Sequence, residues 1–333
     1  MNLPITSIIV PVFNAQNTIR RCIDAILKSK TNNFEVIIVD DHSTDNTLKI
    51  LKRYQKKSNV KIICQPKNKG ASTSRNTGAR HARGKYLVFI DADVAPKKDC
   101  VAQLISLYDA NKRIGMTQGA LLHQKTKKVE SYGHYLTILG FPYDLTERPQ
   151  QLRKPVYRTF GTKALYSYRK EIFLKIMGQD EDYIFHGEDT DLSWRVALAG
   201  YETHFITKAQ GVHYHIDYKK REIDLYSFSE GSKNQISNII KNSSGLLLAP
   251  MLLLNIVSWL FLSIKMLAMK KFNYAYAIYG GFFWNIQNIK HTLKKRQKIK
   301  RYTAPDNDTI SVMFGPLNIF QILYKGMRWL FYV

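Results

Sequence analysis

The sequence predicts an α/β fold in which helices flank a mostly parallel sheet, followed by a C-terminal helical region that associates with a membrane. Three observations predict it. Apolar, β-branched segments alternate with segments of helical periodicity at the N-terminal end, which is the pattern of βαβ units. Polar residues follow three of the apolar segments directly. Beyond residue 245 the chain becomes strongly apolar and then basic, so we expect a division into residues 1–240 and 241–333.

The first part of the chain supplies four predicted strands, which cover residues 7–13, 34–41, 60–65 and 85–91. Helical periodicity predicts helices over 17–29 and 44–57, and a Gly-punctuated loop at 68–84 leads into a helix that begins near residues 72–74. Sites in parallel sheets lie at the carboxyl ends of the strands. The residues that follow these strands, Asn14, Asp40–Asp41 and Asp91–Asp93, are therefore expected to lie together.

The pattern becomes mixed between residues 95 and 215. Helices are predicted at 101–111 and 188–201, and strands at 114–123 and 202–207. The stretch 124–160 is polar and contains three prolines, so it is expected to be rich in loops.

The charge balance favours anionic partners, because the 333 residues carry a formal net charge of +24. Nucleic acid, an anionic membrane face and phosphorylated substrates all fit this charge. No recognised nucleic-acid-binding motif is present, and acids at the strand ends would repel phosphate, so a nucleic-acid binder is disfavoured. The three cysteines show no CxxC spacing, which favours a reducing compartment. The N-terminal segment reads as a strand and not as a signal peptide.

The C-terminal region has the composition of a membrane-contacting segment. Residues 246–264 contain no charge and are just long enough to cross a bilayer, and residues 272–286 are apolar and aromatic. From residue 268 onward there are eleven Lys and Arg against two Asp. The sequence permits a spanning hairpin, two helices lying in one leaflet, or a buried core helix at 246–264. Flanking lysines and aromatic residues favour an interface with anionic lipid.

Asp91 and Asp93 follow the buried run at 86–90 and stand one residue apart. Residues i and i+2 of an extended segment point the same way, so both carboxylates can reach one divalent cation. Mg²⁺ or Mn²⁺ is typically held by one or two carboxylates together with substrate phosphates. Two solvated turn acids are the alternative interpretation.

Asp41 and Arg75 are candidate nucleotide contacts. Asp41 ends the second strand, where its carboxylate could accept a hydrogen bond from a base N–H. The alternative role is to cap the next helix, which the residues at 43–45 could also do. The small residues at 68–79 let backbone N–H groups approach a phosphate, to which Arg75 could add a cationic contact.

Glu188, Asp189 and Asp191 stand at the start of the helix predicted at 188–201. Acids in a first helical turn are stabilised by the helix dipole, and one of them could also act as a general base toward an acceptor hydroxyl. His213 and His215 share one strand face if residues 211–217 are extended, and they could complete a metal site or contact a diphosphate.

The chain resembles family 2 glycosyltransferases, which have the nucleotide-sugar-binding GT-A fold, over roughly residues 5–240. The resemblance rests on four linked segments in this order: SIIVPVFN, VIIVDDHSTDNT, NKGASTSRNTGARHARGKYLVFIDAD and GEDTDLSWRVALAGY. The segment 211–241 resembles the rhamnosyltransferase-type branch of the family.

The resemblance implies an inverting transfer from a nucleoside diphosphate sugar, with a divalent cation that neutralises the leaving diphosphate. It places the nucleotide near the residues Pro11, Phe13, Asn14, Asp41 and Arg75. It assigns Asp91 to the ribose or metal side and Asp93 to the metal, and it gives His213 as a further metal or diphosphate ligand. Glu188–Asp189 matches the ED motif of the family, which makes Asp189 the expected base and Asp191 the alternative.

Two departures from the family pattern bear on the pocket for the nucleotide base and on whether the enzyme is processive. His42 replaces the usual small residue after the paired aspartates, and the Gln-x-x-Arg-Trp motif of processive synthases is missing after the ED motif. A single-addition enzyme at the cytoplasmic membrane face is expected, with a lipid-linked or glycan acceptor. A polyprenyl-phosphate sugar synthase and a non-catalytic scaffold of glycan assembly are the alternatives.

Overall fold

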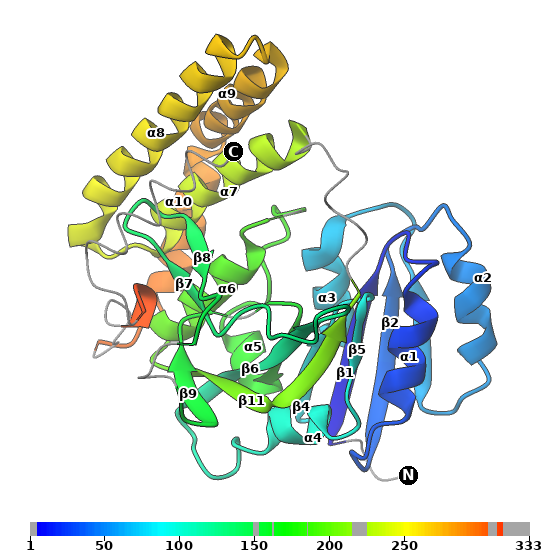
Figure 1. Cartoon of the computed structure of the whole chain (residues 1–333). Helices are drawn as coiled ribbons and strands as arrows, with labels where there is room; N and C mark the ends of the chain where they lie inside the picture. Colours follow the sequence, from blue (N-terminus) through cyan, green and yellow to red (C-terminus); the bar gives the residue numbers. More distant parts are fainter. Residues whose placement is uncertain are drawn as a thin grey trace.

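The computed structural model describes residues 5–148, 153–161, 163–184, 186–214, 225–305 and 312–315. One large sheet runs through the body of the molecule, and a group of helices from the C-terminal part of the chain stands beside it (Figure 1). The strands of the large sheet follow one another in the order β3-β2-β1-β4-β10-β6-β11-β5, and β9 pairs with β11. The described residues thus form the expected α/β fold, in which the sheet is parallel in its first half and mixed in its second.

The first half of the sheet is parallel. It consists of β1 (Thr6–Val12), β2 (Phe34–Asp40), β3 (Val60–Cys64) and β4 (Tyr86–Ile90). In the register of β1 and β2, Val12 lies opposite Asp40, so the carboxyl ends of both strands lie side by side. The four predicted strands are confirmed, and their ends meet where the sequence places the polar residues.

The second half of the sheet is mixed. The strand β10 (Leu165–Arg169) lies antiparallel between β4 and β6 (Ile114–His123). The long strand β11 (Glu202–His213) runs parallel to β6. Two short antiparallel strands, β5 (Val94–Pro96) and β9 (Val156–Thr159), pair with β11. The antiparallel strand β10 was not predicted, and it is the element that joins the two halves.

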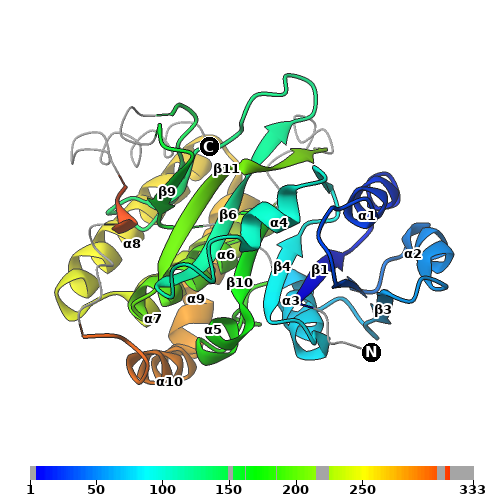
Figure 2. The same ribbon diagram turned by 90° about the horizontal axis from the view of Figure 1, so that it is seen from below.

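Helices cover both faces of the sheet (Figure 2). On one face α1 (Ile19–Leu27) and α4 (Cys100–Ile105) pack on β1, β4 and β11 through a cluster that includes Ile23, Val88 and Val101. On the other face α3 (Gly70–His81), α5 (Lys170–Lys175) and α6 (Glu188–Leu198) enclose a second cluster built around Phe89, Tyr166 and Leu192. The sheet is therefore buried on both sides.

Some elements differ from their predicted bounds. The helix predicted at 44–57 is α2 (Thr47–Leu51) followed by the 3-10 turn η1 (Lys52–Tyr54), and the helix predicted at 101–111 ends at Ile105. The helix of the Gly-punctuated loop begins at Gly70, ahead of the predicted start. The stretch 124–160 is loop-rich as expected, but it also contains β9 and the two-stranded sheet of β7 (His134–Leu136) and β8 (Pro142–Asp144).

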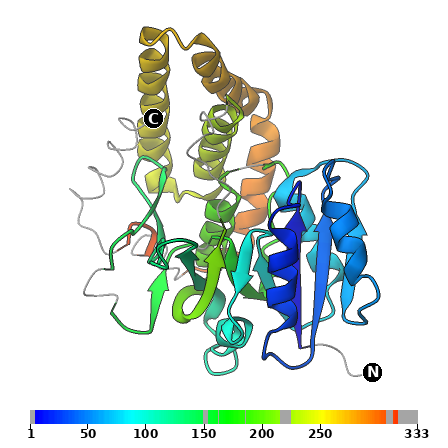
Figure 3. The ribbon, with the colours of Figure 1, turned by 45° about the vertical axis from the view of Figure 1, so that its right-hand side comes forward.

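Four helices follow in the C-terminal part: α7 (Leu225–Asn242), α8 (Gly245–Ala268), α9 (Phe272–Gln287) and α10 (Ile289–Lys300). The helices α8 and α9 form a hairpin that extends away from the sheet (Figures 1 and 3). Both helices and α10 contact α7. Among the described residues, α8 is the single helix long and apolar enough to cross a bilayer.

The α8–α9 hairpin has polar side chains on its buried side and large apolar side chains on its exposed side. The buried side of α8 includes Asn255, Ser258 and Ser263, whereas its exposed side carries large apolar residues such as Leu253 (64% exposed) and Ile264 (63%). All three buried polar side chains make a hydrogen bond: Asn255 Nδ2 donates to Leu139 O at 2.6 Å, Ser258 Oγ donates to Leu254 O at 2.7 Å, and the Ser263 and Tyr279 hydroxyls lie 3.0 Å apart. An exposed apolar stripe of this extent is typical of an interaction surface.

Candidate active site

The loops after β1 and β2 are joined by side-chain hydrogen bonds. Asn14, in a left-handed conformation at φ 48°, accepts from Thr44 N at 2.8 Å, and its own N–H donates to Ser43 Oγ at 3.0 Å. Pro11 lies in β1 opposite Val39, and Phe13 follows the strand with its side chain half exposed. The predicted nucleotide residues of β1 thus lie together at the carboxyl end of the strand.

Asp41 is buried and supports the loop that leads into α3. Its Oδ1 accepts from Lys69 N at 2.9 Å and from Gln65 Nε2 at 3.0 Å, and its Oδ2 accepts from Gly70 N at 2.7 Å. Burial raises the pKa of Asp41, although these backbone hydrogen bonds oppose the change. Gly70 has φ +86°, and a Cβ there would lie 2.7 Å from the Ile184 backbone, so the close approach requires glycine. The contact of Asp41 with a base stays a prediction.

Arg75 connects the two acidic motifs. It lies on α3 with 3% of its surface exposed. Its Nη2 is 2.8 Å from Asp91 Oδ1 and its Nη1 is 3.4 Å from Glu188 Oε1. Burial raises the pKa of Asp91, and the Arg75 guanidinium opposes the change. The predicted residues Arg75, Asp91 and Glu188 are therefore brought together, with the Arg75 guanidinium already engaged by carboxylates.

Asp93 and His213 also meet, as the sequence predicts. Asp93 Oδ2 is 3.4 Å from His213 Nε2, and the Tyr214 N–H donates to Asp93 O at 2.8 Å where β11 passes β5. His213 Nδ1 is 2.9 Å from Glu130 Oε2. Burial alone would lower the pKa of His213, but hydrogen bonds to Asp93 and Glu130 raise it to about 9. Glu130 is a site residue that the sequence did not indicate.

The donor set at Asp91, Asp93 and His213 suits a divalent cation that also binds substrate phosphates. Carboxylate oxygens are preferred by Mg²⁺ and Mn²⁺, and these ions typically take one or two protein carboxylates. No group of three or more His, Cys, Asp or Glu residues within the described part of the chain encloses a metal by itself. The arrangement therefore fits a cation completed by the ligand better than a closed protein site. His215 lies outside the described residues.

Asp189 has the properties of a general base. It stands in the first turn of α6 beside Glu188, and its Oδ1 is buried without a hydrogen-bond partner. Burial raises the pKa of Asp189 well above its ordinary value, and the neighbouring Glu188 carboxylate adds to the rise. A carboxylate that is desolvated and unpaired in this way has a high affinity for a proton. The geometry suits removal of a proton from a bound hydroxyl.

Asp191 was the alternative base, and the structure corrects this choice. Its side chain is fully buried on the far side of α6. It lies 2.6 Å from Arg195 Nη2 and 2.8 Å from Lys241 Nζ, and it accepts from Asn242 Nδ2 at 2.9 Å. Residues i and i+2 of a helix point about 200° apart, so Asp189 and Asp191 serve opposite faces. Asp191 therefore anchors α6 to α7, and these ion pairs disfavour it as the base.

A second cluster of titratable residues lies close to Asp189. His134 Nδ1 is 3.0 Å from Asp144 Oδ1, Lys163 Nζ is 3.2 Å from Asp144 Oδ2, and His134 Nε2 is 3.3 Å from the Thr190 hydroxyl. His134, Asp144 and Lys163 line a cavity of about 90 Å³ together with Glu130. His134 and Asp144 come from the loop-rich stretch 124–160, which carries no periodic pattern from which their proximity could be deduced.

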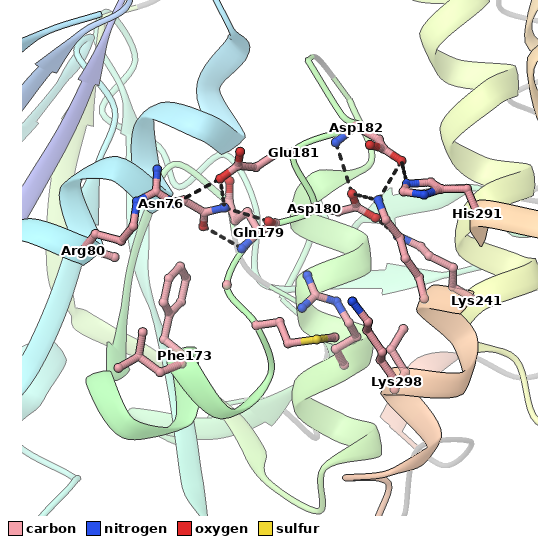
Figure 4. Close-up of a pocket in the computed structure, with 17 residues that line it drawn as sticks. Asn76, Arg80, Phe173, Gln179, Asp180, Glu181, Asp182, Lys241, His291 and Lys298 are labelled. Atoms are coloured by element: carbon pink, nitrogen blue, oxygen red, sulfur yellow. Dashed lines mark hydrogen bonds and ion pairs between the residues drawn. The ribbon is translucent and has the colours of Figure 1, made fainter. Parts of the chain in front are cut away.

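A larger cavity of about 490 Å³ lies behind α3, between α5 and α10 (Figure 4). Its wall carries an ion-pair network in which Asp180 Oδ2 is 2.5 Å from Lys241 Nζ, and Asp182 Oδ2 is 2.6 Å from Lys295 Nζ and 3.0 Å from His291 Nε2. Lys295 also pairs with Asp180. This network ties the segment before α6 to α7 and α10. None of the predicted site residues lines this cavity.

A family model described as "Glycosyl transferase family 2" matches residues 7–176. The glycosyltransferase GlyA of Streptococcus pneumoniae is 34% identical over 33% of this chain, a segment that spans 16% of GlyA. The putative teichuronic acid biosynthesis glycosyltransferase TuaG of Bacillus subtilis is 32% identical over 47% of this chain and 68% of its own length. The crystal structure of GalNAc-T7 with UDP, GalNAc and Mn²⁺ shares the fold, at a TM-score of 0.63 and 18% identity over 87% of this chain and 58% of that chain.

Proposed function

The chain belongs to glycosyltransferase family 2, and we propose that it transfers one sugar per cycle from a nucleoside diphosphate donor to a hydroxyl of a lipid-linked or glycan acceptor, with inversion. The observation that carries the proposal is the position of Asp189. Its unpaired carboxylate oxygen stands at the start of α6, next to Glu188 and the Arg75–Asp91 ion pair. The residue after Glu188 is thus the proton acceptor, and Arg75 joins Glu188 to Asp91 of the candidate diphosphate site.

Inversion follows from a single displacement. The acceptor hydroxyl attacks the anomeric carbon of the donor sugar, the bond from that carbon to the diphosphate oxygen breaks, and Asp189 takes the hydroxyl proton. The raised pKa of Asp189 favours this step, because a more basic carboxylate takes the proton earlier. The products are the glycosylated acceptor, with its new bond on the opposite face of the sugar, and the nucleoside diphosphate.

We assign the donor to the carboxyl ends of β1, β2 and β4. Pro11, Phe13 and Asn14 flank the position for the base, and Asp41 holds the loop at 68–70 that borders it. GalNAc-T7, which shares the fold, was crystallised with UDP, which supports a nucleotide donor for this chain. The resemblance to the rhamnosyltransferase branch remains a hypothesis about the donated sugar.

We propose that Asp93, with Asp91 and His213, holds a Mg²⁺ or Mn²⁺ ion together with the donor diphosphate. The ion would neutralise the charge that develops on the leaving diphosphate. Glu130 would fix the His213 ring, because it contacts the other ring nitrogen. Arg75 would hold Asp91 and Glu188 at a fixed separation between the donor and the base.

We further propose that residues 1–240 are the catalytic unit and that residues 241–333 attach it to the cytoplasmic face of a membrane. The exposed apolar side chains of α8 and α9 support this attachment. They include Leu253, Phe283 and Ile286, with 64%, 60% and 71% of their surface exposed. The basic helix α10 would face anionic headgroups.

The hairpin suits a position along one leaflet better than a spanning one. Its exposed residues recur on one side of each helix, while the other side packs on α7 and on the partner helix. Phe228 of α7 lies 5.1 Å from Tyr274, ring centre to ring centre, close to the hairpin tip. Since α7 also carries the buried Glu230–Lys233 ion pair, a spanning hairpin would draw these charges to membrane depth.

The test is a thermal-shift screen with UDP-, GDP- and dTDP-sugars in the presence of Mn²⁺, followed by measurement of nucleotide release from each donor that stabilises the protein. We expect at least one of the three donor classes to stabilise the protein and to release its nucleotide. Absence of both effects with all three donor classes would refute the proposed activity.

A further inference from the structure

A cavity of about 290 Å³ lies between the start of α6, α7 and α8, and the site described so far does not use it. His186, Gly187 and Thr190 form the wall nearest to Asp189, and Phe228 and Trp259 form the wall toward the hairpin. The cavity thus extends from the first turn of α6, which carries Asp189, to Trp259 of α8.

One face of α7 forms the floor of this cavity. Ser227, Gly231, Gln235 and Asn238 line it and recur at successive helical turns. Gly231 permits the close approach of α8, because a Cβ there would lie 3.2 Å from the Trp259 ring. The face therefore combines an aromatic wall with hydroxyl and amide groups.

The cavity is fixed to the backbone that carries the base. The Asn238 Nδ2 group donates to Gly187 O at 3.0 Å, and Asn234 Nδ2 donates to His186 O at 2.7 Å. The Tyr183 hydroxyl donates to Asn238 Oδ1 at 2.8 Å. Since Gly187 immediately precedes Glu188 and Asp189, a ligand held by α7 is placed relative to Asp189 by these bonds.

We propose that this cavity receives the sugar end of a neutral, lipid-carried acceptor glycan and presents its hydroxyl to Asp189. The inference rests on the proposed glycosyl transfer and selects the acceptor class. An aromatic wall with hydroxyl and amide groups suits a neutral sugar, whose faces are apolar and whose edges form hydrogen bonds.

The charges around the cavity argue against a lipid phosphate as the group that reacts here. The described lining residues include no Lys or Arg. The remaining titratable group of the lining is His186, and its burial lowers the pKa, which favours the neutral ring. A phosphate would lose its hydration in this cavity without a cationic partner among these residues. The apolar stripe of α8 leads from the Trp259 wall toward the membrane, where a lipid carrier would lie.

The experiment uses the full chain in a zwitterionic detergent, labelled with 5-fluorotryptophan. The chain has four tryptophans, and W259F assigns the ¹⁹F signal of Trp259. The neutral probes are the decyl glycosides of glucose, galactose and N-acetylglucosamine, and the anionic probe is farnesyl phosphate. We expect at least one glycoside to shift the Trp259 signal and to raise nucleotide release above donor hydrolysis, and farnesyl phosphate to do neither.

The matched variants are S227F, which fills the cavity from α7, and L225F, which adds the same ring at an exposed position of the same helix outside the lining. S227F is expected to reduce the glycoside-stimulated release at least tenfold, and L225F to leave both this release and donor hydrolysis within twofold of the wild type. The proposal is overturned if farnesyl phosphate shifts the Trp259 signal, if no glycoside does, or if S227F retains the stimulation. Failure of the glycosyl-transfer proposal itself is recognised separately, because the wild-type chain would then release no nucleotide from any donor.

Discussion

Arg75 Nη2 lies 2.8 Å from Asp91 Oδ1, and the other end of the same guanidinium reaches Glu188 at 3.4 Å. One buried cation thus joins an acid that follows β4 to an acid that begins α6. The sequence suggested that Arg75 binds the donor diphosphate directly, whereas its observed contacts give it the role of spacing two acidic motifs.

The variant R75M is expected to lose most activity, because it leaves two enclosed carboxylates without their shared cation. Breaking a buried ion pair in this way typically costs about 3–5 kcal/mol, so the melting temperature should fall as well. R75K keeps the charge but not the two-armed geometry, and we expect it to recover stability more than activity. Equal recovery of both by R75K would contradict the spacing role. Melting curves and nucleotide release with a saturating donor measure the two effects.

D189N is expected to lower transfer by about 10²–10⁴-fold, the usual contribution of a general base. The acid limb of the pH profile should lie above the ordinary range of an aspartate, because burial and Glu188 raise the pKa of Asp189. Activity should therefore fall as the pH decreases through this raised value. The measurement is kcat/KM against pH for the wild type. D99N, at an exposed position, serves as the control, and an acid limb near the ordinary aspartate value would contradict the role of Asp189.

E130Q is expected to weaken the apparent affinity for Mn²⁺ about 10-fold, as second-layer changes at metal sites typically do. Glu130 contacts His213 Nδ1 at 2.9 Å, on the side away from Asp93, so the variant loosens the ring without removing a ligand. Activity at saturating Mn²⁺ should remain close to that of the wild type. D93N should lose activity at every Mn²⁺ concentration. E147Q, at an exposed position, is the control for E130Q, and an unchanged Mn²⁺ titration in E130Q would refute the arrangement.

D180N is expected to destabilise the chain by about 3 kcal/mol, because it removes a buried partner of Lys241 and Lys295. Burial alone would raise the pKa of Asp180, but Lys241 and Lys295 lower it below the value in the unfolded chain. A lowered pKa stabilises the folded state above the unfolded value near ~3.9, and this stabilisation is lost as the pH falls toward the folded value. The difference between D180N and wild type in urea unfolding should therefore shrink below about pH 4.

The control for D180N is E181Q, because Glu181 pairs with Arg80 at the surface. An exposed pair of this kind contributes about 0–1 kcal/mol. Similar losses in the two variants would show that the buried network does not stabilise the attachment of α7 and α10.

The variants I264D and F283D are expected to reduce binding to anionic vesicles, since each places a charge in the exposed stripe of the hairpin. L174D, an equally exposed apolar position on α5, should leave binding unchanged. Vesicle flotation provides the measurement. If I264D and F283D float as well as the wild type, the hairpin is not the membrane-binding surface.

The depth of the hairpin is tested at its tip. K270C should remain open to an impermeant maleimide when the protein is bound to the outside of sealed vesicles, because the hairpin is expected to lie along the near leaflet. Protection of this cysteine, with normal labelling after detergent is added, would indicate a spanning hairpin. The three native cysteines are first replaced by serine or alanine, since Cys64 is exposed.

The parallel half of the fold could be predicted because each of its strands is a short apolar run bounded by polar residues. The strand β10 could not be predicted in the same way. Its Ser167 and the facing Thr117 and Tyr108 carry hydroxyls, which are satisfied by one another at 2.8 Å only after the strand is in place. A polar group that is paired across distant parts of the chain leaves no local signal in the sequence.

The acids of the site were predictable from motifs, but their separate roles were not. Asp189 and Asp191 are the same residue type two positions apart, so the sequence does not distinguish them. Because the helix has 3.6 residues per turn, Asp189 lies on the side of the site and Asp191 lies in an internal ion pair. Glu130, His134 and Lys163 enter the site from segments without periodicity. Their positions depend on how the loop-rich stretch folds over the sheet edge.

The inward-facing polar groups of α8 have a practical consequence for handling the protein. Asn255 joins α8 to the backbone at Leu139 and Ser263 joins α8 to α9, so we expect the hairpin to stay folded on removal from lipid and to expose its apolar stripe to water. Two such stripes can cover one another, and the +24 charge spread over the chain opposes their approach only weakly at high ionic strength. Particle size should therefore grow with added salt and return to that of single molecules when a mild detergent takes the place of the bilayer.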